Sequence, residues 1–157
     1  MNRLVYGVLP GLILALAVAA GLLKWHDGSV RAEEQIRAET VSVATESTIA
    51  MLSFSSDTIE QDVADVQQLM TEGFRDRFAA RARQHIVPDA KARKITAVAE
   101  VPGAASVWAT AKHAVVLVFV DRTVSVGDSE PVEAASSYRV TLDNVDGRWL
   151  VADFEPV

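Results

Sequence analysis

The amino-acid sequence predicts an α+β protein in which one N-terminal hydrophobic helix precedes a single domain. An uncharged run from Leu4 to Leu23 lies near the start of the chain. Apolar side chains then recur at helical spacing, and after about residue 94 the pattern changes to the alternation and short apolar runs of strands. Helices followed by strands are typical of helices packed on one face of an antiparallel sheet. The predicted segments are a membrane anchor over 1–25 and one domain over 26–157, divided into a leading helix (26–56), further helices (57–94) and the sheet (95–157).

The uncharged run has the length of a transmembrane helix. At about 1.5 Å per residue, a helix from Leu4 to Leu23 spans the roughly 30 Å hydrocarbon layer of a bilayer. Lys24 and Trp25 follow as interfacial anchors. The competing interpretation is a cleaved signal peptide, because Ala17–Ala19 resembles a cleavage site. Since Arg3 favours a cytoplasmic N-terminus, we expect a single-pass cell-membrane protein whose domain lies outside the cytoplasm.

Small side chains recur every four residues along the predicted anchor. Gly7, Gly11, Ala15 and Ala19 would share one helix face, where the backbone of another helix could approach closely. Gly and Ala are also common in transmembrane helices generally, and Pro10 would disturb such a groove. The sequence therefore leaves two interpretations, a transmembrane packing face and an ordinary lipid-facing helix.

Two features predict where helices begin and end between residues 57 and 94. Asp57 and Glu60 have the spacing of a capping box that starts a helix. A later apolar stripe begins at Phe74, and we expect its helix to end before Pro88 because the residue preceding a proline disfavours helical angles.

The second half of the chain carries the strand signals. Val115–Val120 is a short, continuous, β-branched run that predicts a central strand buried on both faces. Residues 138–143 alternate between apolar and polar, as in a half-buried strand, and Asp146–Gly147 is a strong signal for a two-residue hairpin turn. Ile95–Val101 is a weaker first strand, so we expect about four antiparallel strands.

Charge excludes one class of partner and indicates another. The formal net charge is −6, which is unsuited to nucleic-acid binding, and the chain has no cysteine for disulfides or thiolate metal sites. One mid-chain stretch is nevertheless basic. It is a possible interaction face for acidic partner loops or anionic lipid headgroups, or else an ordinary solvated surface. Its members are Arg75, Arg77, Arg81, Arg83, Lys91, Arg93 and Lys94.

The sequence gives no indication of catalysis. His26, His85 and His113 are the only histidines, and they do not have metal-ligand spacing. Motifs for nucleophilic hydrolysis and phosphate binding are absent. His113 with Asp121 or Asp153 is the one conceivable acid–base set, and solvated side chains explain it better. We expect no enzyme, no cofactor and no metal site.

Several phrases of the sequence resemble one family when they are taken together. These phrases, in order, are Leu69–Asp76 with Phe78, Ile86–Lys91, Val115–Thr123, and Tyr138–Leu142 with Val145–Val151. They resemble the Mce-associated membrane proteins, which are companions of the mammalian-cell-entry lipid importers of the bacterial envelope. The likeness extends from the hydrophobic helix to Val157.

The resemblance implies a fold, a role and partners. The fold is like that of nuclear transport factor 2 (NTF2-like), a curved sheet wrapped by helices. The role is that of a non-catalytic accessory subunit that stabilises a Mce-type lipid importer, with importer subunits and the membrane as partners. The alternatives are an assembly factor of a secretion or conjugation machine, and a lipid-binding carrier module. A large pocket lined by Phe74, Phe78 and Phe119 would favour the carrier.

The anchor interpretation predicts that the mature protein keeps its first residues and stays with membranes in alkaline carbonate, because a buried apolar helix resists ionic extraction. N-terminal sequencing and carbonate extraction measure this. A mature N-terminus near Ala20, with the protein in the supernatant, would support the cleaved signal peptide instead.

Overall fold

The computed structural model describes residues 33–157. The predicted anchor (1–25) and its small-residue face at Gly7, Gly11, Ala15 and Ala19 lie outside the described residues and stay predictions. The chain divides into two compact units, Met1–Gln35 and Ile36–Val157, and the structure of the first is described only for helical residues 33–35. Between residues 33 and 157, no helix is both long and apolar enough to cross a membrane.

The first half of the described chain is helical. Residues 33–52 form the leading helix, and shorter elements follow a brief loop. These are α2 (Ile59–Val66), the 3₁₀ turn η1 (Gln67–Leu69), α3 (Glu72–Arg81), the π segment η2 (Ala82–Ile86) and α4 (Val87–Arg93).

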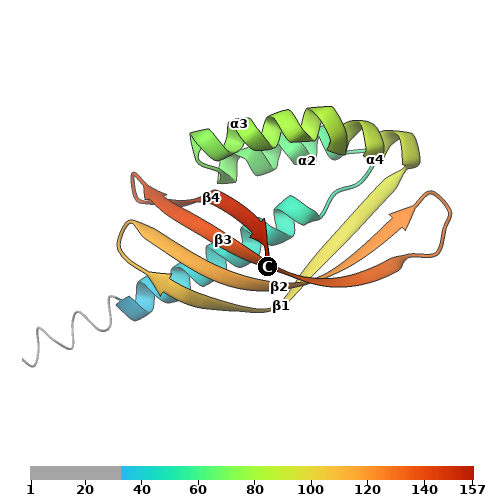
Figure 1. Cartoon of the computed structure of the whole chain (residues 1–157). Coiled ribbons are helices and arrows are strands. Elements are labelled where there is room, and N and C mark those ends of the chain that lie inside the picture. Colours follow the sequence, from blue (N-terminus) through green and yellow to red (C-terminus); the bar gives the residue numbers. More distant parts are fainter. Residues whose placement is uncertain (1–32) are drawn as a thin grey trace, which may run out of the picture. The chain divides into compact units, whose positions relative to one another are not determined.

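Four strands complete the domain as one antiparallel sheet in the order β1-β2-β3-β4. The helices lie over one side of this curved sheet (Figure 1). The α+β order of helices before a four-stranded antiparallel sheet therefore agrees with the prediction. The strands are β1 (Ile95–Ala109), β2 (His113–Val126), β3 (Val132–Val145) and β4 (Arg148–Pro156).

Two backbone bridges tie the helical half to both edges of the sheet. Phe54, just after the leading helix, exchanges two 2.9 Å hydrogen bonds with Ala97 of edge strand β1. At the opposite edge, Met70 bridges Val151 of β4, and the Thr71 N–H donates to the Val151 carbonyl at 2.9 Å. The chain between these bridges, including α2, must therefore cross from one edge of the sheet to the other.

The core lies between the helices and the sheet. The leading helix contributes small buried side chains at Thr40, Ala44, Ser47 and Thr48, which let it approach the sheet closely. Ala44 belongs to a hydrophobic cluster that also contains Met70 and buried valines of the strands, and the other three are buried polar residues of the same helix. Because unmade hydrogen bonds are costly in such a core, its polar members matter for stability.

The prediction that Val115–Val120 is buried on both faces is wrong. Val116, Val118 and Val120 are at most 1% exposed, whereas Phe119 is 48% exposed on the other face. Helices cover only one side of β2 within the described chain. A continuous apolar run therefore does not require two covering layers.

Two predicted helix boundaries are also wrong. The helix does not end before Pro88, because the wider turn of η2 intervenes and the Val87 N–H donates to the Ala82 carbonyl five residues back. Pro88 then lies in the first turn of α4, where its missing N–H costs little.

Asp57 and Glu60 do not form the predicted capping box. Thr58 is the N-cap of α2, and its hydroxyl donates to the Asp62 carboxylate at 2.9 Å. The same carboxylate accepts a hydrogen bond from the Ser55 N–H at 3.2 Å, so Asp62 pairs a backbone donor of the loop that precedes the helix. The hairpin at Asp146–Gly147, by contrast, is confirmed, with positive φ at both residues.

Thr48 provides a test of the core. Its hydroxyl is buried and has no hydrogen-bond partner among the described residues. We predict that Thr48→Val raises the free energy of unfolding by about 1 kcal/mol, because a buried unpaired hydroxyl costs about 1–3 kcal/mol.

Thr40→Val is the matched control. Thr40 lies on the same helix and is equally buried, but its hydroxyl donates to the Arg37 carbonyl at 3.0 Å. Thr40→Val should raise the free energy of unfolding less than Thr48→Val does, since it removes a hydrogen bond worth about 1 kcal/mol. Urea denaturation of both variants makes the comparison, and equal destabilisation by the two would contradict the unpaired state of Thr48.

Candidate functional site

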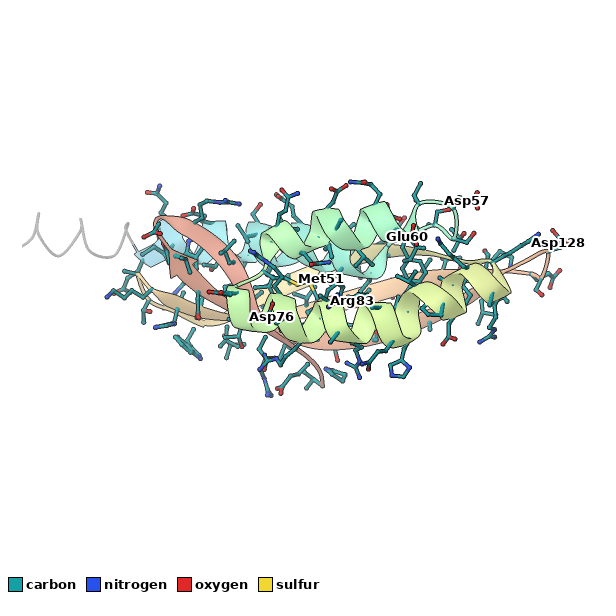
Figure 2. All side chains as sticks on the ribbon, turned by 90° about the horizontal axis from the view of Figure 1, so that it is seen from above. Met51, Asp57, Glu60, Asp76, Arg83 and Asp128 are labelled. Carbon is teal, nitrogen blue, oxygen red and sulfur yellow. The ribbon has the colours of Figure 1, made fainter. Side chains whose placement is uncertain are left out.

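Two adjoining cavities open between the helices and the sheet, and together we call them the interlayer cleft. The larger has a volume of about 490 Å³ and lies between α3 and the edge of β3 and β4. The smaller, of about 240 Å³, lies toward α2. Met51, Leu52, Phe78 and Ile86 line both cavities. Figure 2, seen from above, places Met51 between α2 and α3.

Aromatic side chains from both layers shape the larger cavity. Phe74 and Phe78, one helical turn apart on α3, have ring centroids 6.4 Å apart. Tyr138 of β3 stacks on Phe154 of β4 at 4.5 Å between ring centroids. The helical layer and the sheet each present one aromatic pair, so the cavity wall is largely apolar.

Charged side chains stand around this apolar space. In the larger cavity, Arg77 pairs with Asp153 at 3.5 Å and lies over the Phe74 ring at 5.6 Å from its centroid. Arg81 lines the same cavity and makes no ion pair or side-chain hydrogen bond to another described residue. In the smaller cavity, Arg122 and Asp62 both contribute to the lining.

Phe119 does not line this cleft, although the carrier interpretation grouped it with Phe74 and Phe78. It lies on the uncovered face of the sheet, where it is 48% exposed opposite Gly103. Trp108, 46% exposed, lies opposite Val115 on the same face. With Leu117 between them on β2, Trp108, Val115, Leu117 and Phe119 form what we call the outer strip.

The predicted basic face is divided by the structure. Arg75 donates to the carbonyls of Gln67 and Met70 at 3.0 and 3.1 Å, so it stabilises the turn before α3. Arg77 binds Asp153 on the sheet, and Lys91 binds Glu60 of α2 at 2.7 Å. Arg83 (Figure 2) donates to the carbonyl of Ala79 on its own helix.

Arg93 and Lys94 end the helical half, and Lys94 adopts a left-handed conformation at the end of α4. All seven basic residues are solvent-exposed. Because three of them are held by other elements, they do not act as one uncommitted group, and an interaction role stays a prediction.

The conceivable acid–base set is not assembled. The Nδ1 atom of His113 lies 2.8 Å from the Asp143 carboxylate on β3, in an exposed pair, and not beside Asp121 or Asp153. Asp121 is in register with Ala135, far along β2 from His113. Residues 33–157 contain no group of three or more His, Asp or Glu side chains placed to hold a metal ion.

The sequence alone did not indicate that Arg122 lines the cleft or that Tyr138 stacks on Phe154. Arg122 faces the helical side, because its cross-strand partner Ala99 is a core residue. An arginine on the core-facing side of a strand was a usable signal, since charged residues are rarely buried without a function or a partner. The stack depends on the register of β3 with β4, which the sequence alone does not fix.

The fold is similar to that of domains from secretion machines. It matches an IcmL-like type IV secretion system protein from Legionella pneumophila with a TM-score of 0.67 and 11% identity, over 77% of this chain and 91% of that chain. The periplasmic domain of DotI matches with a TM-score of 0.65 and 13% identity, over 75% of this chain and 92% of that chain. The VirB8 protein of Agrobacterium tumefaciens matches with a TM-score of 0.62 and 15% identity, over 78% of this chain and 92% of that chain. At these identities the likeness concerns the fold alone, and it confirms the expected NTF2-like arrangement of helices on an antiparallel sheet.

Closer relatives come from Mycobacterium tuberculosis. Outer membrane protein Rv1973 of strain ATCC 25618 / H37Rv is 49% identical over 152 residues, which cover 97% of this chain and 95% of that protein. The uncharacterized protein Rv1362c of the same strain is 36% identical over 152 residues, which cover 93% of this chain and 69% of that protein. Residues 4–157 match the family model described as uncharacterized protein Rv1363c/MT1408-like. The chain therefore belongs to the Rv1363c/MT1408-like family.

Proposed function

We propose that this protein is a non-catalytic, membrane-anchored accessory subunit that assembles or stabilises a protein complex of the bacterial envelope. Its domain lies outside the cytoplasm and binds other subunits. We propose a Mce-type lipid importer as the complex, because the phrases of the sequence resemble the Mce-associated membrane proteins. A relative named outer membrane protein supports a membrane location.

The observation that carries this proposal is the outer strip. Trp108 and Phe119 are both about half exposed on a sheet face that no described helix covers. Large aromatic side chains are enriched at the centres of protein interfaces, where they contribute a large share of the binding energy. Since exposed large apolar side chains that lie close together mark interaction sites, we infer that a partner subunit covers the two exposed aromatic rings of this strip.

The flanking charges suit a protein partner. Arg139 and Glu155 form an exposed 3.7 Å pair across β3 and β4, and Arg139 is in register with Leu117 of the strip. An apolar centre beside polar groups is the usual anatomy of an interface between subunits. Among residues 33–157, this surface carries the exposed His113–Asp143 pair, and we propose binding as its role.

An assembly factor of a secretion or conjugation machine is the second candidate. One observation favours it, since the structural neighbours are type IV secretion proteins. The two candidates share the essential claim of a protein partner and differ in which complex supplies it.

The test is affinity purification of the intact protein in mild detergent, followed by identification of co-eluting proteins. We expect importer subunits from the wild type and at least a tenfold loss of them from a Trp108→Ser/Phe119→Ser variant, because a few buried aromatic anchors commonly supply more than about 2 kcal/mol. The variant should keep its helical and strand content, since both side chains lie outside the core.

Val132→Ser is the matched control. Val132 is 66% exposed but is in register with Val124, near the turn between β2 and β3 and away from the strip. It should leave co-purification unchanged. Undiminished capture by the double variant would remove the outer strip as the interface, and co-elution of secretion components instead of importer subunits would favour the second candidate.

A further inference from the structure

We propose that the interlayer cleft binds a free long-chain fatty acid, with the hydrocarbon chain beneath α3 and the carboxylate at Arg81. The cleft and the outer strip lie on opposite sides of the sheet, so this ligand site would not require the protein partner proposed above.

The composition of the cleft favours a hydrocarbon ligand. Its larger cavity, about 490 Å³, falls within the roughly 300–1,000 Å³ of small-molecule sites. Phe74, Phe78 and Phe154 give water few hydrogen-bond partners there. Water in such a space is poorly held, and its replacement by an apolar group is favourable.

The form of the cleft favours a long chain over a compact ring. The two cavities adjoin at Met51, Leu52, Phe78 and Ile86, which line both of them. One cavity reaches toward Pro156 at the end of β4, and the other toward Ile59 of α2. The two cavities therefore lie next to each other on either side of these four side chains, and an unbranched chain that displaces the flexible Met51 side chain would occupy both.

Charge complementarity places the acid group at the larger cavity. Arg77 and Arg81 line it together with a single carboxylate, that of Asp153, which Arg77 already binds. Arg81 is left without an ion pair in the described chain, at the rim of an apolar space. A guanidinium matches a carboxylate with two parallel hydrogen bonds, and this geometry suits a fatty acid better than an uncharged lipid. The smaller cavity holds one Arg and one Asp, so it offers no comparable excess of positive charge.

The wall of the cleft includes part of the π segment η2. Arg81 directly precedes the π segment η2, and Ile86 is the last residue of that segment. Such π turns occur frequently at functional sites because they redirect side chains that a regular helix would place elsewhere. Met51 adds a flexible side chain that adapts to irregular apolar ligands.

The experiment uses the intact protein in phosphatidylcholine nanodiscs and a palmitic acid that carries a photoreactive diazirine on its chain. After illumination, mass spectrometry locates the labelled peptides. We expect label on peptides that contain Met51 or Phe78. Arg81→Gln should reduce labelling at subsaturating probe by about fivefold, the effect of removing one partly exposed charge pair.

Two controls make the result specific. Arg83→Gln changes a neighbouring arginine that bonds only its own helix among the described residues, and it should leave labelling unchanged. The corresponding alcohol probe should label the wild type more weakly than the acid and should not respond to Arg81→Gln.

Three results would overturn the proposal: label outside the cleft or none at all, equal labelling by acid and alcohol, or undiminished labelling of the Arg81→Gln variant. The proposal would also be overturned if phosphatidylglycerol in the disc displaced the probe as effectively as unlabelled palmitate does, because the cleft would then bind a membrane headgroup.

Discussion

The two backbone bridges at the edges of the sheet are the constraint on which the rest of the domain depends. Phe54 is hydrogen-bonded to β1 and Met70 to β4, so the fifteen residues between them must cross the sheet. Edge strands expose unpaired N–H and C=O groups, and these bridges occupy part of both edges. The bridges therefore limit edge pairing with other chains and fix the path of α2 over the sheet.

Because the described helices cover only one side of the sheet, its two sides are different surfaces. On the helical side, the leading helix packs on the sheet through small side chains such as Ala44, and Phe74 and Phe78 of α3 line the cleft. On the other side, no described element covers β1 and β2, and Trp108 and Phe119 remain exposed. The proposed ligand site and the proposed partner site therefore lie on opposite faces, and the strands of the sheet are the only described layer between them.

The predictions that succeeded depend on local patterns. The order of helices before strands follows from apolar spacing, and the turn at Asp146–Gly147 follows from the preference of two adjacent residues for positive φ. Of those that failed, the capping box was replaced by another local arrangement at Thr58 and Asp62, whereas the burial of the central strand depends on contacts distant in sequence. Nothing in Val115–Val120 tells whether one or two layers will cover it. The helix continues through Pro88 by way of the π segment η2, which the sequence pattern did not indicate.

The candidate site was predictable only in part for the same reason. Phe74 and Phe78 were recognisable as one stripe because they are a helical turn apart. The stack of Tyr138 on Phe154 forms only after β3 pairs with β4, and the ion pair of Arg77 with Asp153 forms only after α3 packs on the sheet. Phe119 was assigned to the wrong face because a continuous apolar run hides the alternation that would show which side each residue occupies.

The central claim is that the uncovered face of the sheet is an interface with another subunit. Hydrogen–deuterium exchange of the intact protein, alone in detergent and within its purified complex, tests this most directly, because bound partners protect the backbone and flanking loops they cover. Slower exchange around Trp108 and the β1–β2 turn in the complex, with unchanged exchange in α3 and α4, is the predicted result. Protection confined to the helices, with no change near Trp108, would contradict it.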